Sequence, residues 1–157
     1  MCVKGCGRGI LMTELVIRPA VPSDALTCAA IHHAWIESTS WMPRLHTLED
    51  VQRFYEDHVF PRTRVFVAGD PPQAYLSLDG ENCVTALYSS LPGKGLGKAL
   101  LDHAKDLTRR LCLWTFDANT GAQRFYEREG FKAVRRTDGD NEEGLPDILY
   151  RWEARDA

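Results

Sequence analysis

The sequence lacks a long apolar run and lacks an excess of basic charge. No apolar stretch approaches the roughly 20 residues that a membrane-spanning helix needs, so we expect no membrane partner. Lysine and arginine total 19 against 22 acidic residues, which gives a formal net charge of −3. A nucleic-acid-binding protein usually shows a basic stripe, and none stands out here. These two absences argue against both of those partners.

The cysteines do not form an even set. The chain has five cysteines at irregular spacing. An odd, irregular set argues against a disulfide scaffold and for a reducing compartment, so we predict a cytoplasmic protein. Cys83 and Cys112 lie in apolar strand patterns and are predicted to be core residues. Cys2 and Cys6 have no second pair nearby, and we expect no metal site.

The length of 157 residues is that of one ordinary domain. An apolar fraction of 44% and a charged fraction of 26% are typical of globular proteins. Residues 1–11 precede a second methionine, Met12, and contain no hydrophobic stretch of the kind found in signal peptides. We therefore predict a flexible extension or an upstream start at 1–11, followed by one domain at 12–157.

Hydrophobic periodicity predicts an alternation of strands and helices. The expected strands are 15–18, 64–68, 74–78, 83–88, 111–116, 131–136 and 148–152, and the expected helices are 24–36, 47–58, 96–110 and 120–128. The order is β-α-α-β-β-β-α-β-α-β-β. A β-rich middle followed by β-α-β-α-β predicts an α/β or α+β fold with a mixed sheet.

Residues 92–101 form a glycine-rich segment, which reads Pro-Gly-Lys-Gly-Leu-Gly-Lys-Ala-Leu-Leu. Glycines let the backbone N–H groups approach a ligand closely, and the start of a helix adds free donors and partial positive charge. A P-loop needs Ser or Thr where this chain has Ala99, and the alternating glycines match the dinucleotide fingerprint poorly. The segment predicts either another kind of phosphate site or a glycine-rich turn that binds nothing.

A second informative segment, residues 111–131, begins as an apolar strand and continues as a helix. Asn119 can cap that helix. Its apolar face carries Ala122, Phe125 and Tyr126. Gly130 then suits the end of the helix, and the next strand starts with a phenylalanine.

Together the two segments resemble the GNAT superfamily of acyl-CoA-dependent N-acyltransferases. The loop is similar to the pattern Gln/Arg-x-x-Gly-x-Gly/Ala at Gly95 and Gly97, with Pro92 in place of the Gln or Arg. The second segment matches Asn-x-x-Ala-x-x-Phe-Tyr-x-x-x-Gly-Phe throughout. The resemblance covers about residues 14–154. It implies a single-domain fold with a mixed sheet of about seven strands and about four flanking helices.

The resemblance also implies acetyl-CoA as co-substrate. Its pantetheine arm would lie between strands 83–88 and 111–116, and its pyrophosphate would rest on the glycine loop. The implied cofactor-binding residues are Leu87, Tyr88, Gly93, Lys94, Gly95, Leu96, Gly97, Lys98, Asn119 and Tyr126. The hydroxyl of Tyr126 would protonate the leaving thiolate, which makes Tyr126 the predicted catalytic residue. The alternative is that Tyr126 only packs its helix against the sheet.

A general base is not evident in the sequence. The strand at 83–88 holds no carboxylate, and Glu81 and Asp117 only flank the two central strands. The neighbouring His32 and His33 fall in a helical pattern, where a histidine pair is more often structural or solvated.

The implied activity is transfer of an acetyl group to a primary amine, a small molecule or a peptide, by direct attack in a ternary complex. A non-catalytic acyl-CoA-binding sensor or subunit is the alternative. Trp41, Glu142 and Glu143 are predicted to line the acceptor pocket. The acidic loop would attract a cationic amine, or it is an ordinary solvated loop. A homodimer is left open.

Overall fold

The computed structural model describes residues 16–155 of the chain. The predicted extension at 1–11 lies outside these residues. The strands are β1 (Ile17–Pro19), β2 (Arg64–Ala68), β3 (Ala74–Leu78), β4 (Cys83–Ser89), β5 (Arg110–Phe116), β6 (Lys132–Thr137) and β7 (Asp147–Glu153). The longer helices are α2 (Ala25–Ser38), α3 (Leu48–Phe54), α5 (Leu96–Leu107) and α6 (Thr120–Arg128). The predicted order and the mixed seven-stranded fold are confirmed.

Two helix ends differ from the prediction. The helix that begins after Thr47 continues from α3 through a π-helical segment, η2 (Tyr55–Val59), into the short α4 (Phe60–Arg62). Its start follows the expected capping box, because the Thr47 hydroxyl accepts from Asp50 N and the Asp50 carboxylate accepts from Thr47 N. Helix α5 ends at Leu107 instead of near Arg110, since Arg110 already begins β5.

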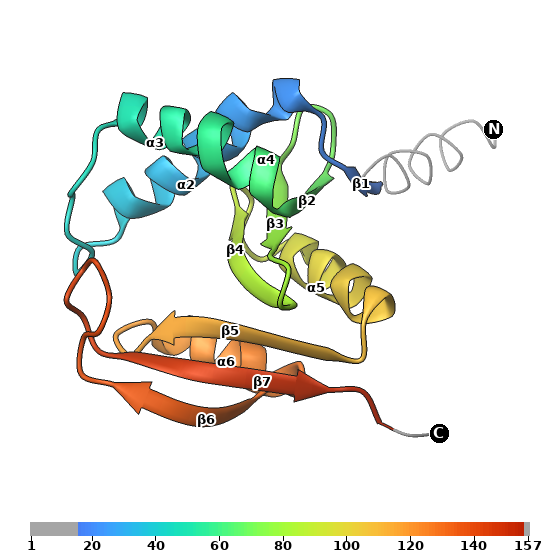
Figure 1. The fold of residues 1–157 in the computed structure, drawn as a ribbon, viewed down its shortest axis with the longest axis vertical. Coiled ribbons are helices and arrows are strands. Elements are labelled where there is room, and N and C mark those ends of the chain that lie inside the picture. Colours follow the sequence, from blue (N-terminus) through green and yellow to red (C-terminus); the bar gives the residue numbers. More distant parts are fainter. Residues whose placement is uncertain (1–15, 156–157) are drawn as a thin grey trace, which may run out of the picture.

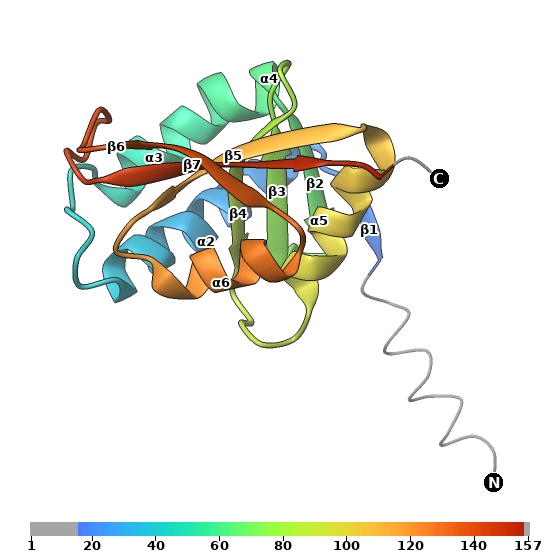
Figure 2. The same ribbon diagram turned by 90° about the horizontal axis from the view of Figure 1, so that it is seen from below.

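The seven strands form one sheet in the order β1-β2-β3-β4-β5-β7-β6. All neighbours are antiparallel except β4 and β5, which are parallel. Figure 1 shows β5, β6 and β7 running together beside α6, apart from β2, β3 and β4. Figure 2, seen from below, shows β5 and β7 running across the direction of β3 and β4. The β4–β5 junction therefore joins the two parts of the sheet.

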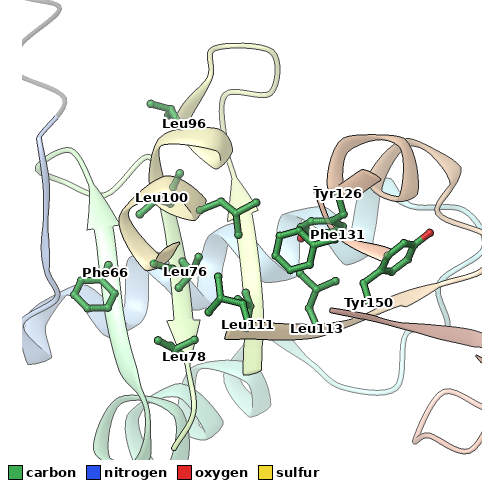
Figure 3. Close-up of a cluster of buried hydrophobic side chains, with 14 of the residues drawn as sticks. Phe66, Leu76, Leu78, Leu96, Leu100, Leu111, Leu113, Tyr126, Phe131 and Tyr150 are labelled. Atoms are coloured by element: carbon green, nitrogen blue, oxygen red, sulfur yellow. The ribbon is translucent and has the colours of Figure 1, made fainter. Parts of the chain in front are cut away.

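Alternation along β2 and β3 divides the apolar side chains between two cores. Val65, Val67 and Tyr75 pack against α2 and α3. Phe66 and Leu76, one position away in each strand, belong to a second core with α5, α6 and the C-terminal strands. Figure 3 shows this second core. Helices thus cover both faces of the sheet, which explains why these strands are apolar at nearly every position.

Cys83 and Cys112 form a disulfide, which corrects the prediction that both are simply core residues. They are direct partners in the parallel β4–β5 register, with Cα atoms 4.5 Å apart, a separation that a disulfide can span. No local sequence pattern indicates this pairing, because the two cysteines are 29 positions apart. Cys28 is a buried free thiol. Cys2 and Cys6 lie outside the described residues.

Candidate functional site

A groove opens where β4 and β5 stop pairing. The two strands pair only at Cys83 with Cys112 and at Val84 with Leu113. Beyond these pairs both strands border a cavity of about 660 Å³, which the glycine loop and α6 also line. All the predicted cofactor residues except Lys94 line it: Leu87, Tyr88, Gly93, Gly95, Leu96, Gly97, Lys98, Asn119 and Tyr126. One groove therefore brings together residues from two separate sequence segments.

The glycine loop presents free backbone donors to this groove. Gly93 and Gly95 have φ values of 79° and 78°, a left-handed conformation that glycine adopts without steric cost. Gly95 is the N-cap of α5, and Ala99 N is the first amide to bond back to Gly95 O. The amides of Leu96, Gly97 and Lys98 therefore have no acceptor within the helix. Together with the positive end of the helix they fit a pyrophosphate.

The two loop lysines differ in their placement relative to the groove. Lys94 does not line the groove. Lys98 lines it, but its Nζ lies 3.1 Å from Glu129 Oε1 and 3.3 Å from Asp102 Oδ2. The hydrogen bond to Glu129, followed by that to Asp102, raises the pKa of Lys98. Because these carboxylates already balance its charge, the backbone amides are the main anion donors of the loop.

Helix α6 places Tyr126 on the opposite wall of the groove. Asn119 caps this helix by accepting from Ala122 N at 3.1 Å. The Tyr126 side chain is 9% exposed, and its ring packs against Phe131 (Figure 3). Every buried side-chain nitrogen or oxygen in residues 16–155 has a hydrogen-bond partner. The Tyr126 hydroxyl has no such partner there, so it is not fully buried. The hydroxyl oxygen must therefore reach the open groove.

The protonation state of Tyr126 suits a proton donor. Burial raises the pKa of this phenol above its usual value, and the nearby Tyr88 adds to the effect. The hydroxyl therefore keeps its proton at neutral pH and can donate it in a hydrogen bond to negative charge that develops beside it.

A second cavity, of about 990 Å³, adjoins the groove. Both cavities are lined by Trp35 from α2, Thr85 and Tyr88 from β4, and Trp114 and Phe116 from β5. The two cavities meet at these five residues, and we call this meeting point the passage. Of these five residues only Tyr88 was predicted from the sequence, because nothing in the local patterns of the other four separates them from ordinary core positions.

The second cavity is rich in carboxylates. Its acidic residues are Asp50, Asp57, Asp140, Glu142, Glu143 and Asp147, and its basic ones are Arg53 and Arg135. Some of the carboxylates are engaged: Glu142 lies 2.5 Å from His46 Nε2, and Asp147 accepts from Asn141 Nδ2 at 3.0 Å. The Glu143 side chain makes no hydrogen bond or ion pair with another described residue. It lies near enough to Tyr88 to raise the pKa of that phenol, after the larger effect of burial.

The three residues predicted for the acceptor pocket divide into two groups. Glu142 and Glu143 line the second cavity. Trp41 is not part of its lining. The Trp41 ring packs edge to face against Trp35 and Phe116, each with centroids 5.8 Å apart, so it supports the passage from behind.

The flanking carboxylates considered as bases lie elsewhere. Asp117 pairs with Arg136 Nη1 at 2.7 Å, and neither Asp117 nor Glu81 lines either cavity. Of the histidine pair, His32 lines the second cavity, stacks on Tyr88 and places Nδ1 2.8 Å from the Tyr55 hydroxyl. Burial, followed by the charge of His33, lowers the pKa of His32 to about 4. His32 is therefore neutral at physiological pH.

Within residues 16–155 no group of three or more histidine, cysteine, aspartate or glutamate side chains is arranged to hold a metal ion. None of the helices in the same range is long and apolar enough to cross a membrane.

Part of the chain, which includes most of the residues that line the groove, is similar to known acetyltransferase sequences. Residues 62–133 match a family model described as an acetyltransferase (GNAT) domain. A peptidyl-lysine N-acetyltransferase, YjaB of Salmonella typhimurium, is 35% identical over 74 residues, which cover 46% of this chain and 50% of that protein. The chain thus matches about half the length of this relative.

Known structures share the fold. Apo YjaB from Escherichia coli superposes with a TM-score of 0.72 at 20% identity, covering 89% of this chain and 98% of that one. The putative acetyltransferase yncA from Salmonella typhimurium, solved with acetyl-CoA, superposes with a TM-score of 0.68 at 18% identity, covering 90% and 95%.

Proposed function

Because the chain belongs to the GNAT superfamily of acetyltransferases, we propose that it moves an acetyl group from acetyl-CoA to a primary amine by direct attack in a ternary complex. The observation that carries this proposal is the meeting of two cavities at one shared wall. One cavity, which we call the acyl-CoA groove, has the free amides of the glycine loop and a protonated tyrosine. The other, which we call the acceptor cavity, is acidic and suits an amine. A thioester at the passage would be within reach of both.

The acyl-CoA side has three groups in assigned positions. The free amides of Leu96, Gly97 and Lys98 hold the pyrophosphate. The edge of β4 beyond Val84 is released from β5 and offers backbone groups to the pantetheine arm. The Tyr126 hydroxyl, on the facing wall, protonates the thiolate as it leaves. Acetyl-CoA itself supplies the activated acetyl group.

The acceptor side favours a cationic amine. Glu143 has no cationic partner among the described residues and lies close to the passage, so it can draw an ammonium group toward Tyr88. The amine must lose a proton before it attacks, since only the neutral form has a lone pair. The name of the relative, a peptidyl-lysine N-acetyltransferase, supports a lysine side chain of a peptide as the acceptor.

Two measurements test this proposal. Acetyl-CoA at 100 times its dissociation constant should stabilise the fold by about 2.7 kcal/mol, which a thermal melt detects. Release of free CoA thiol should then depend on an added primary amine. Stabilisation without amine-dependent release would identify a non-catalytic acyl-CoA-binding protein instead, and an unchanged melting temperature would rule out both.

A charge comparison tests the acceptor side. Glu143→Gln should raise KM for a cationic amine more than Glu142→Gln does, because Glu142 is already paired with His46. The effect should shrink as salt rises, since surface charge is screened over about 8 Å at physiological ionic strength. Equal KM values for the two variants and the wild type, at every salt concentration, would remove the acidic loop from substrate choice.

A further inference from the structure

Three hydrogen-bonded side chains, Tyr75, Tyr55 and His32, run from the core beneath α2 to the acceptor cavity. His32 lines that cavity but not the acyl-CoA groove. Its ring lies flat on Tyr88, with centroids 4.5 Å apart and planes 16° apart. Its Nδ1 contacts the Tyr55 hydroxyl at 2.8 Å, and that hydroxyl in turn contacts the hydroxyl of Tyr75.

The direction of these hydrogen bonds follows from the burial of Tyr75. This side chain has no exposed surface, and its hydroxyl meets only that of Tyr55 among the described residues. If Tyr55 donated to Tyr75, the proton of Tyr75 would be buried without an acceptor, which is costly. Tyr75 therefore donates to Tyr55, and Tyr55 donates to His32 Nδ1. A neutral imidazole whose Nδ1 accepts carries its proton on Nε2.

The Nε2–H group of His32 opens into the cavity. Every buried side-chain nitrogen or oxygen in residues 16–155 has a hydrogen-bond partner. The Nε2–H group has none there, so this atom is not fully buried. The groups around the ring are Tyr55 from η2, Tyr88 from β4, and Trp35 and His33 from α2 itself. None of these side chains carries a negative charge at neutral pH, so nothing beside the ring stabilises a protonated imidazolium.

We propose that the Nε2–H of His32 is a specificity-determining donor, which binds a carbonyl or hydroxyl oxygen carried by the amine substrate. This inference rests on the proposed acetyltransferase function. The thioester oxygen is the less suitable partner, because His32 is not part of the acyl-CoA groove. The carboxylates of the same cavity cannot donate to an oxygen, whereas the unpartnered Nε2–H of His32 can. The site then selects an amine with a nearby oxygen, such as a peptidyl lysine, over a plain alkyl diamine.

The tautomer can be tested without any enzymatic assay. In protein labelled with ¹⁵N-histidine, the two ring nitrogens of His32 should show the pattern of a neutral Nε2–H imidazole from pH 8 down to pH 5. Titration with Nα-acetyl-lysinamide should shift the Nε2 signal, and titration with 1,5-diaminopentane, which has no oxygen, should not. A proton on Nδ1, or equal shifts with both amines, would overturn the proposal.

Steady-state kinetics with the same two amines tests the role in selection. His32→Phe keeps a flat ring beside Tyr88 and removes the donor, so the ratio of KM for Nα-acetyl-lysinamide to KM for the diamine should rise about 3- to 10-fold. His32→Gln, which restores a donor, should recover part of the loss. An equal loss of kcat with both amines would refute the proposal in favour of contact with the thioester or of a structural role.

The failure of this inference and that of the acetyltransferase function are distinguishable. If the wild-type protein acetylates neither amine, the proposed function is wrong for these acceptors. The ¹⁵N measurement still decides whether His32 donates to an oxygen-bearing amine.

Discussion

Gly97→Ala separates the role of the glycine loop in binding from its role in folding. Gly97 is the second residue of α5 and does not have a positive φ. An added Cβ would meet only the Phe125 ring, at 3.8 Å, which is an ordinary contact. Replacing glycine by alanine at a compatible site stabilises a protein by about 0.4–1 kcal/mol. For a domain of this size the melting temperature should rise by about 1–3 °C.

The same methyl group should weaken acetyl-CoA binding. Gly97 and Phe125 both line the acyl-CoA groove, and the amide of Gly97 is one of the three free donors. A side chain at this point keeps phosphate oxygens away from the amide. Loss of one hydrogen bond to a charged group costs about 1.5–3 kcal/mol, which corresponds to an increase of roughly 10- to 150-fold in the dissociation constant. Stability and affinity should therefore move in opposite directions.

Two further variants serve as controls, with affinity measured by calorimetry and stability by thermal melts. Gly121→Ala changes the second residue of α6, which is the position equivalent to Gly97 in α5. A Cβ there meets nothing within 4 Å, and Gly121 does not line the groove. This variant should raise the melting temperature of the protein without changing its affinity for acetyl-CoA. Gly95→Ala should lower both, because its φ of 78° is unfavourable for alanine. Wild-type affinity in a folded Gly97→Ala protein would refute the assignment of the loop to phosphate.

Three other predictions concern the leaving group, the disulfide and an ion pair. Tyr126→Phe should lower kcat by about 10²-fold at unchanged acetyl-CoA affinity, and full turnover would return Tyr126 to a packing role. Reduction of Cys83–Cys112, which are 29 positions apart, should lower the free energy of unfolding by about 3.5 kcal/mol; equal urea midpoints with and without reductant would contradict this. The hydrogen bond from Arg18 lowers the pKa of Asp24. This pair therefore stabilises the fold above about pH 4, the pKa of an ordinary aspartate. The stabilisation is lost as pH falls through the lowered pKa. Asp24→Asn should therefore destabilise at pH 7 and have less effect at pH 3, as measured by urea unfolding.

Local sequence features were enough to predict the order of elements and the glycine loop that precedes α5. The capping box at Thr47, the alternating glycines before α5 and the segment from Asn119 to Phe131 each act over a few neighbouring residues. Their geometry follows from backbone sterics, capping hydrogen bonds and helical periodicity, which depend on residue type and spacing alone. The predicted loop residues consequently line one groove, apart from Lys94.

Tertiary structure alone decided how these segments meet. The divergence of β4 from β5 after two paired residues opens the groove, and the same register joins Cys83 to Cys112. The buried environment of His32 depends on Tyr55 and Tyr75, which lie in other elements. Strand register and the packing of a helix on a sheet are set by contacts between residues far apart in the chain. No local pattern encodes those distances, so the cavity proposed to hold the acceptor, and its neutral histidine, could be found only in the folded molecule.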